Sequence, residues 1–419
     1  MAAPPAPPTL LVKNIGELVT FAPLAKEQRT TQITEADTGS LQNAWLRIGA
    51  GRVRDFGTGT PPETSGPVLD ASGGLVMPGM VDCHTHPLWA GDRSGEFARR
   101  LDGATYQEIA AAGGGILSTV AATRACDDQQ LLELAAGRLQ AMLRQGSTTV
   151  EMKSGYALDV DEEIRQLKIL QRVAGRARQT TRITCLAPHA IPPGKTAGAW
   201  AREASQKLLP RIAAEGLAHR VDAFIENGYF SVDDCRPWFE QAAALGLECT
   251  VHADEFSDAG AARAAAGWGA RSADHLEETP ADAIAAMAAA GTIAVLLPGT
   301  SLYTAIPFAD ARPFLRAGCA VAIASDFNPG SCLFYNQAMM ATLGALHNHL
   351  PPAAAMAAVT FVGAAALGLA TKKGSLAAGA DADFLLYGFP GRHHWLADAG
   401  RTAPQGIWIQ GEKETSVMM

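Results

Sequence analysis

The sequence predicts an α/β protein, a (β/α)8 TIM-type barrel with a small β-sandwich domain built from both chain ends. Eight apolar runs typical of strands alternate with helical stretches through the middle of the chain. Short β-type runs with little helical periodicity occupy both ends. Polar or ionisable residues follow most of the central runs, and in a barrel the carboxyl ends of the strands form the catalytic face.

The two ends of the chain show the same sequence pattern, in which short β-type runs are separated by Gly and Pro. Strands this short need partner strands to be stable. We therefore expect residues 1–77 and 371–419 to fold together as the small β domain, and residues 78–370 to form the barrel. The β-type runs are residues 10–15, 44–49, 74–77, 379–388 and 406–411.

The central strands and helices alternate in the order that a barrel requires. Helical stretches such as 128–145, 161–178 and 282–290 separate the strands. An open doubly wound sheet is the alternative, but it would need a Gly-rich dinucleotide turn where the sequence has His84-Thr-His-Pro. Gly113-Gly-Gly-Ile follows a helix, and we interpret it as an active-site segment, although turn glycines explain it equally well. The predicted strands end near His86, Lys153, His189, Asn227, His252, His275, Pro298 and Asp326.

Composition and charge limit the classes of function. The 419 residues are 48% hydrophobic and 18% charged, which is typical of a compact soluble α/β enzyme. A net charge of -8 without a Lys/Arg run argues against nucleic-acid binding. Seven scattered cysteines indicate no disulfide framework, so we expect a reducing, cytoplasmic compartment. The first residues lack the features of a signal peptide, and we expect no membrane partner.

Four ionisable residues at strand ends suit a metal site. His84 and His86 belong to one predicted strand, in which residues i and i+2 point to the same face. His252 and Asp326 each close another strand. One such His would more simply be a buried core residue, but the combination of three imidazoles and a carboxylate predicts an open divalent-metal site.

Such a site predicts hydrolysis or deamination, because a bound metal can lower the pKa of water to about 7. Glu255, three residues after His252, could pass a proton to a leaving nitrogen, although an acid at a helix N-terminus explains it without function. His275 closes the next strand and could hold the water or stabilise an oxyanion. The fourth run, 221–227, carries no lysine for a carbamate bridge, so we expect one metal.

Further polar residues predict a small pocket for an anionic substrate. Arg93 could hold a carboxylate with two hydrogen bonds, although exposed arginines are common. Two more candidates follow the second and third strands, and three follow Asp326. The last three offer a side-chain amide, a glycine whose backbone a ligand can approach closely, and a hydroxyl. These candidates are Arg93, Tyr156, His189, Asn328, Gly330 and Ser331.

Longer motifs carry a resemblance to a known family. The segment Gly79-Met-Val-Asp-Cys-His-Thr-His-Pro resembles the hallmark of the metal-dependent amidohydrolase superfamily. More specific motifs, in order along most of the chain, are similar to those of the imidazolonepropionase family within it. They are Ala90-Gly-Asp-Arg-Ser-Gly-Glu-Phe, Gly113-Gly-Gly-Ile-Leu-Ser-Thr-Val with Thr123-Arg124, Thr148-Thr-Val-Glu-Met-Lys-Ser-Gly-Tyr, His252-Ala-Asp-Glu-Phe, Ser272-Ala-Asp-His-Leu and Ser325-Asp-Phe-Asn-Pro-Gly-Ser.

The resemblance implies a reaction and roles for the candidate residues. Water would open 4-imidazolone-5-propanoate to N-formimidoyl-L-glutamate, a step of histidine degradation. Asp326 and His275 would help to deprotonate the water, Glu255 would protonate the leaving nitrogen, and Arg93 would hold the propionate. One zinc or iron ion would be bound by His84, His86, His252 and Asp326. The substrate contacts would be Arg93, Tyr156, His189 and Glu255, with Asn328, Gly330 and Ser331 near the product end.

Three other interpretations stay open. A cytosine- or guanine-type aminohydrolase would use the same ligands but gives less reason for Arg93 and Tyr156 to face an anionic tail. A non-catalytic scaffold relative would be expected to have lost ligands, and none is missing. A dinucleotide-dependent enzyme lacks its sequence fingerprint. The choice between zinc and iron stays open, and a homodimer is a further expectation.

Overall fold

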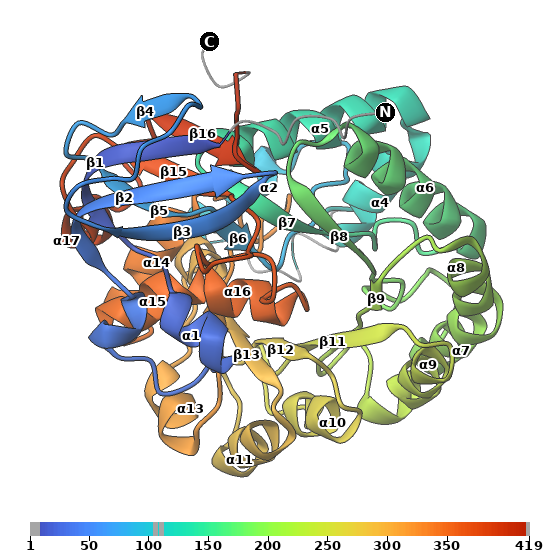
Figure 1. Cartoon of the computed structure of the whole chain (residues 1–419). Coiled ribbons are helices and arrows are strands. Elements are labelled where there is room, and N and C mark those ends of the chain that lie inside the picture. Colours follow the sequence, from blue (N-terminus) through green and yellow to red (C-terminus); the bar gives the residue numbers. More distant parts are fainter. Residues whose placement is uncertain (1–8, 104–107, 109–112, 416–419) are drawn as a thin grey trace.

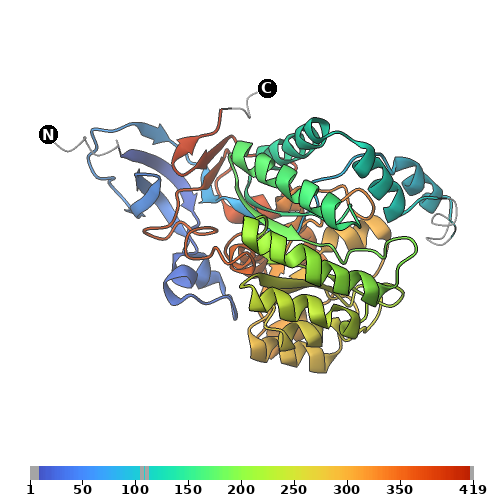
Figure 2. The ribbon, with the colours of Figure 1, turned by 90° about the vertical axis from the view of Figure 1, so that its right-hand side faces the viewer.

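The computed structural model describes residues 9–103, 108 and 113–415. A sheet built from both ends of the chain lies beside a ring of strands that is surrounded by helices (Figure 1). Turning the molecule by 90° places the sheet at one side of the barrel (Figure 2). Residues 1–8, on which the expectation about a signal peptide depends, lie outside the described residues.

The ring is a parallel barrel with its strands in sequence order. Two short strands share the fourth position, one on either side of Asp222 and Ala223. Past the strand ends, the Asp326 backbone N–H donates to the His84 carbonyl over 3.0 Å, which links the last and first positions. The (β/α)8 prediction is confirmed. The strands are β6 (Met80–Asp82), β7 (Ser147–Lys153), β8 (Thr180–Cys185), β9 (Arg220–Val221), β10 (Phe224–Ile225), β11 (Glu248–Ala253), β12 (Ser272–His275), β13 (Ile293–Leu296) and β14 (Val321–Ile323).

The predicted strand ends differ from the observed ones at several positions. β7 and β12 end at Lys153 and His275, as predicted. β6 ends at Asp82, however, so His84 and His86 lie in the extended segment that follows it rather than in the strand. The physical reason is that the ladder with β7 stops at Asp82, and the segment then bridges to the neighbouring eighth position through Thr85 and Phe327.

Amphipathic helices cover the outside of the ring (Figures 1 and 2). α6 buries Ile164, Leu167, Leu170 and Val173, whose spacing of three places them on one helical face. The predicted stretches 128–145, 161–178 and 282–290 correspond to α5, α6 and α11 within two residues. The helical elements of this part are α2 (Ser94–Leu101), α4 (Ile116–Ala125), α5 (Asp128–Arg144), α6 (Val160–Arg176), α7 (Ala197–Glu203), η2 (Ala204–Leu208), α8 (Leu209–Glu215), α9 (Val232–Ala244), α10 (Ala261–Gly267), α11 (Ala281–Ala290), α12 (Pro298–Thr304), α13 (Ala311–Ala317), α14 (Gln337–Leu346), α15 (Pro352–Ala358) and α16 (Phe361–Ala366).

The second sheet joins the two ends of the chain. Its order is β17-β16-β15-β5-β1-β2-β3, with β4 paired to β1. β5 pairs with β1 from the beginning of the chain and with β15 from its end, and Phe384 stacks on Trp408 with ring centroids 4.5 Å apart. The domain boundaries after 77 and 370 stay predictions. The elements are β1 (Leu10–Leu18), α1 (Ala22–Glu27), η1 (Glu35–Thr38), β2 (Leu41–Gly49), β3 (Arg52–Thr58), β4 (Val68–Asp70), β5 (Leu75–Pro78), β15 (Phe384–Tyr387), α17 (Arg392–Ala397), β16 (Gly406–Ile409) and β17 (Glu412–Lys413).

The helices show no sign of a membrane span. Among residues 9–103, 108 and 113–415, none combines the length and the apolar character needed to cross a bilayer.

Candidate active site

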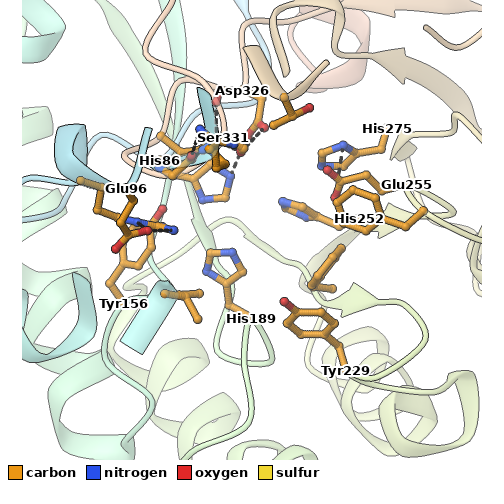
Figure 3. A pocket seen from close by; sticks show the side chains of 18 residues that line it. His86, Glu96, Tyr156, His189, Tyr229, His252, Glu255, His275, Asp326 and Ser331 are labelled. Carbon is orange, nitrogen blue, oxygen red and sulfur yellow. Dashed lines mark hydrogen bonds and ion pairs between the residues drawn. The ribbon is translucent and has the colours of Figure 1, made fainter. Parts of the chain in front are cut away.

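A cavity of about 170 Å³ lies at the carboxyl ends of the barrel strands, and it gathers the predicted site residues. His84 does not line it. That residue is fully buried, with its ring centroid 4.4 Å from that of His252. Figure 3 shows side chains from opposite sides of the barrel pointing into the common space. The predicted residues that line the cavity are His86, Arg93, Tyr156, His189, His252, Glu255, His275, Asp326, Asn328, Gly330 and Ser331.

The four predicted metal ligands converge at one point beside this cavity, with His84 buried behind the lining residues. Ligand nitrogens of His84, His86 and His252 all lie within 4.8 Å of one another. His84 Nε2 and His86 Nε2 are 3.3 Å apart, and Asp326 Oδ1 lies 3.4 Å from the first and 3.2 Å from the second. A tetrahedral ion with bonds of about 2.1 Å places its ligands about 3.4 Å apart. The donor atoms of His84, His86 and Asp326 therefore have the spacing that a single bound ion requires, and a ring nitrogen of His252 lies within 4.8 Å of those of the other two histidines.

The charges at this point also suit a cation. The Thr300 hydroxyl donates to Asp326 Oδ2 over 2.6 Å and leaves Oδ1 facing the imidazoles. Burial and the ammonium of Lys153 favour the neutral form of His84, but the carboxylates of Asp274 and Asp326 outweigh them and raise its pKa to about 9. Burial lowers the pKa of His252 to about 3. His252 is thus a neutral donor, whereas His84 favours a positive charge beside Asp274 and Asp326 and would exchange its proton for a metal ion. The same excess of negative charge suits a divalent cation.

Two buried aspartates stand behind the histidines. His84 Nδ1 is hydrogen-bonded to Asp274 Oδ2 over 2.6 Å, and His252 Nδ1 lies 2.9 Å from Asp222 Oδ2. Such partners fix the ring orientation and direct the other nitrogen at a metal. The sequence analysis missed both aspartates. The available signal was an acid within or directly after a predicted buried strand, where it must find a partner.

The backbone at two strand ends is held in an unusual conformation. His275 has φ +82° and Asp326 has φ +50°, in the left-handed region that side chains other than glycine rarely adopt. Strained backbone of this kind persists where the surrounding structure enforces it, and it is common at functional sites. Both side chains are thereby directed into the cavity.

Glu255 is the acid nearest to His275. Its Oε2 lies 3.7 Å from His275 Nδ1, and Glu277 Oε2 lies 4.0 Å from the same nitrogen. Burial, together with the carboxylates of Glu277 and Asp326, holds the pKa of Glu255 well above its ordinary value. This shift favours the protonated form of Glu255. Burial also raises the pKa of Glu277, a residue that the sequence analysis missed, to about 8.

Arg93 is fixed at the opposite end of the cavity. Its Nε and Nη2 each lie 2.9 Å from Glu96 Oε2. The other oxygen of Glu96 accepts from the Gly115 backbone N–H over 3.0 Å and from the Ser118 hydroxyl over 3.3 Å. A Cβ atom at Gly330 would collide with the Arg93 guanidinium, so glycine permits this close approach. Glu96 connects the predicted anion anchor to the glycine segment 113–116.

Arg100 is a second guanidinium at this end, and the sequence analysis missed it. Its Nη2 donates to the Gly330 carbonyl over 3.3 Å, and its charge lies 5.4 Å from the ring centroid of Tyr303. Arg93, Arg100 and Glu96 together leave one net positive charge, which suits an anion. The sequence held a signal for this group: Arg93, Glu96 and Arg100 are spaced about one helical turn apart, which places them on the same face of α2.

Aromatic rings form the remaining walls. His189 stacks on His86 with ring centroids 5.4 Å apart, and its Nδ1 lies 3.1 Å from the Gly155 carbonyl. Burial lowers the pKa of His189 to about 3, so the ring is neutral. Phe224 and Tyr229, which the sequence analysis missed, pack together with centroids 4.6 Å apart. Both come from segments near the fourth strand position, and no sequence motif marks them.

Asn328 shapes the loop that follows Asp326. Its amide nitrogen donates to the Asp326 carbonyl over 2.7 Å, and its amide oxygen accepts from the backbone N–H groups of Gly330 and Ser331 over 2.8 Å each. The hydrogen-bonding groups of the Asn328 side chain are therefore used within its own loop. They hold the loop so that Gly330 and Ser331 face the cavity. The Ser331 hydroxyl lies 3.5 Å from Asp326 Oδ2 (Figure 3).

Comparisons with known proteins agree with this geometry. The sequence model of the amidohydrolase family matches residues 75–413. The imidazolonepropionase of Symbiobacterium thermophilum is 43% identical over 401 residues, covering 93% of this chain and 92% of the relative. That of Pseudomonas entomophila is 42% identical over 388 residues, covering 91% and 94%. The chain belongs to the imidazolonepropionases of the amidohydrolase family.

Solved structures at low identity share the fold. 5-Methylcytosine deaminase from Klebsiella pneumoniae, liganded with 5-fluorocytosine, has a TM-score of 0.72 at 16% identity, covering 97% of this chain and 96% of that chain. A mutant atrazine chlorohydrolase from Arthrobacter aurescens, complexed with zinc and atraton, has a TM-score of 0.67 at 15% identity, covering 96% and 94%. At these identities the likeness shows the barrel architecture alone.

Proposed function

We propose that this chain is a metal-dependent cyclic amidohydrolase that opens 4-imidazolone-5-propanoate with water to N-formimidoyl-L-glutamate, a step of histidine degradation. One observation carries the proposal. A cluster of three histidines and an aspartate lies beside a small cavity whose other end holds Arg93, Arg100 and Glu96. These three side chains together carry one net positive charge. The histidine and aspartate cluster suits metal-assisted hydrolysis of an amide, and the positive charge of the arginines suits the substrate's propionate group. The names of the relatives support the same substrate.

The metal would be held by His84, His86, His252 and Asp326. These nitrogen and oxygen donors suit zinc or iron, and their spacing fits one ion. When bound, such an ion supplies Lewis acidity and can lower the pKa of water to about 7.

The protons are handled by three residues of the chain. Asp326 is an anion, because its imidazole partners hold its pKa well below the ordinary value despite burial. Burial lowers the pKa of His275 well below its ordinary value, so this ring is a neutral acceptor. Asp326 and His275 can therefore take the proton of the attacking water, and His275 can then donate to the developing oxyanion. Glu255 starts protonated and donates its proton to the departing ring nitrogen.

The substrate is placed by the other end of the cavity. Arg93, supported by Arg100, binds the propionate carboxylate. Tyr156, His189 and Tyr229 flank the ring, and Gly330 with Ser331 lies beside the product. A cytosine- or guanine-type substrate carries no anion for the two arginines, and the comparisons do not favour it. A small anionic substrate is part of this proposal, and the homodimer stays a prediction.

Turnover of the purified protein tests the proposal. Loss of imidazolone absorbance should accompany formation of N-formimidoyl-L-glutamate, and chelation of the metal should abolish both. Release of ammonia from cytosine or guanine, with no reaction of imidazolone propionate, would contradict the proposal.

A further inference from the structure

Lys153 is a fully buried lysine in the interior of the barrel, at the carboxyl end of β7. Its Nζ lies 2.7 Å from Asp222 Oδ2, 2.8 Å from Glu151 Oε2 and 3.9 Å from Asp274 Oδ2. A buried ammonium is retained only where such partners compensate for the loss of water. The mechanism above makes no use of this residue.

Two of these carboxylates reach the candidate metal centre. Asp222 Oδ2 lies 2.9 Å from His252 Nδ1, and Asp222 Oδ1 also accepts from the His252 backbone N–H over 3.1 Å. Asp274 Oδ2 is hydrogen-bonded to His84 Nδ1 over 2.6 Å. His84 follows the first barrel strand and His252 belongs to the fifth, so the two rings come from opposite sides of the barrel. Lys153 lies behind both of them.

The third carboxylate does not depend on Lys153 alone. Glu151 Oε1 also lies 3.4 Å from Arg220 Nη1 and accepts from the Thr184 hydroxyl. Asp222 and Asp274 accept hydrogen bonds from Ala223, Thr250 and the histidines, but within the described residues Lys153 is the only lysine or arginine that lies within 4 Å of either. Without it, these two buried carboxylates would lose the one ammonium that they share.

We propose that Lys153 is a positioning residue for the metal centre, holding Asp222 and Asp274 so that these aspartates fix the imidazoles of His252 and His84 for metal binding. The inference rests on the proposed function in one respect, that these histidines bind the metal. It adds a single cation that sets the orientation of two ligands at once. Residues that orient metal ligands typically affect metal affinity by 10- to 100-fold.

Metal titration of the purified protein tests this role without any substrate. We expect Lys153→Met, which keeps the length of the side chain but removes the charge, to weaken Zn²⁺ binding about 10- to 100-fold in competition with a chromogenic chelator. The visible absorption bands of the Co²⁺-loaded protein should also change, because they report ligand geometry. If Lys153→Met does not fold, Glu151→Gln/Lys153→Met removes one charge of each sign, and it should show the same loss of affinity.

Lys373 offers a matched control. Its Nζ is also buried, 2.7 Å from Asp383 Oδ2 and 3.1 Å from Asp381 Oδ2, beside the sheet of the two chain ends. Lys373→Met removes an equivalent ion pair away from the metal centre. We expect a lower melting temperature with native Zn²⁺ affinity and a native Co²⁺ spectrum.

Two results would overturn the role of Lys153. One is a folded Lys153 variant, single or double, with native Zn²⁺ affinity and a native Co²⁺ spectrum. The other is an equal loss of affinity in Lys373→Met, which would make the effect one of general stability. Wild-type protein that binds neither metal tightly would instead contradict the proposed function.

Discussion

Replacement of Arg93 by Met removes the predicted anchor of the substrate carboxylate, and the structure sets the size of the effect. A hydrogen bond to a charged group contributes about 1.5 to 3 kcal/mol, which corresponds to about 10- to 150-fold in affinity. The change also leaves Glu96 without its partner, because both Arg93 nitrogens lie 2.9 Å from Glu96 Oε2. The freed carboxylate would repel the propionate. We therefore expect KM to rise toward the upper end of this range, about 100-fold.

Steady-state kinetics with imidazolone propionate measures this effect, together with the metal content of each variant. Because Arg93 does not touch the metal ligands, kcat and bound metal should change little. Arg93→Met/Glu96→Gln provides the control, since it removes the freed charge as well. We expect the double variant to recover part of the loss, with a KM about 10-fold above the native value, so that the two substitutions are not additive.

A different pattern would refute this reasoning. If Arg93→Met keeps its affinity for imidazolone propionate but loses metal, Arg93 is structural and the anchor lies elsewhere. A double variant that is as impaired as the single one would show that Glu96 carries no repulsion.

Four further predictions follow from the structure. Elemental analysis should find one tightly bound transition metal per chain, and two would contradict the assignment of a single site. Arg100→Met should raise KM on the order of 10-fold without loss of metal, and an unchanged KM would leave Arg93 as the sole anchor. Glu255→Gln should keep its metal and its KM but lose turnover by about 10²- to 10⁴-fold, whereas a near-normal rate with a lower melting temperature would remove Glu255 from the mechanism. Burial raises the pKa of Glu163 from 4.5 to about 7, so the folded chain binds this proton more tightly than the unfolded chain and the free energy of unfolding should fall by about 3 kcal/mol between pH 4.5 and 7. Denaturant unfolding should show this fall in the wild type relative to Glu163→Gln, and parallel pH profiles would contradict it.

The sequence predicted the barrel, and it marked the candidate metal ligands, because those signals are local. The apolar spacing along α6 and the pair His84 and His86 can be recognised within a few residues. The ends of the strands were less predictable. β8 ends at Cys185, four residues before His189, because the final residues leave the ladder and turn over the cavity. Residue propensity and hydrophobic pattern do not predict the residue at which a strand stops pairing with its neighbour.

The supporting residues of the site were missed because their contacts are long-range. Asp274 meets His84 across a sequence separation of 190 residues, and Arg100 meets Gly330 across 230. A single sequence shows an acid in a buried strand, but it does not show which residue on the far side of the barrel compensates it. Lys153 illustrates the point: the sequence placed it at the end of the second strand, and only the fold brings Asp222 and Asp274 to it.

In the proposed mechanism the two ends of the cavity perform separate tasks, and their separation orients the ring. Glu255 and His275 would handle protons at one end, while Arg93 and Arg100 would attract an anion at the other, with the candidate metal ligands near His86 between them. A carboxylate held by the arginines limits the orientations in which the attached ring can approach the metal. Contacts to such a remote group restrict how the substrate binds, so their loss raises KM and lowers kcat/KM. Glu96, which holds Arg93 and the glycine segment together, fixes one of the two guanidinium groups on which that orientation depends.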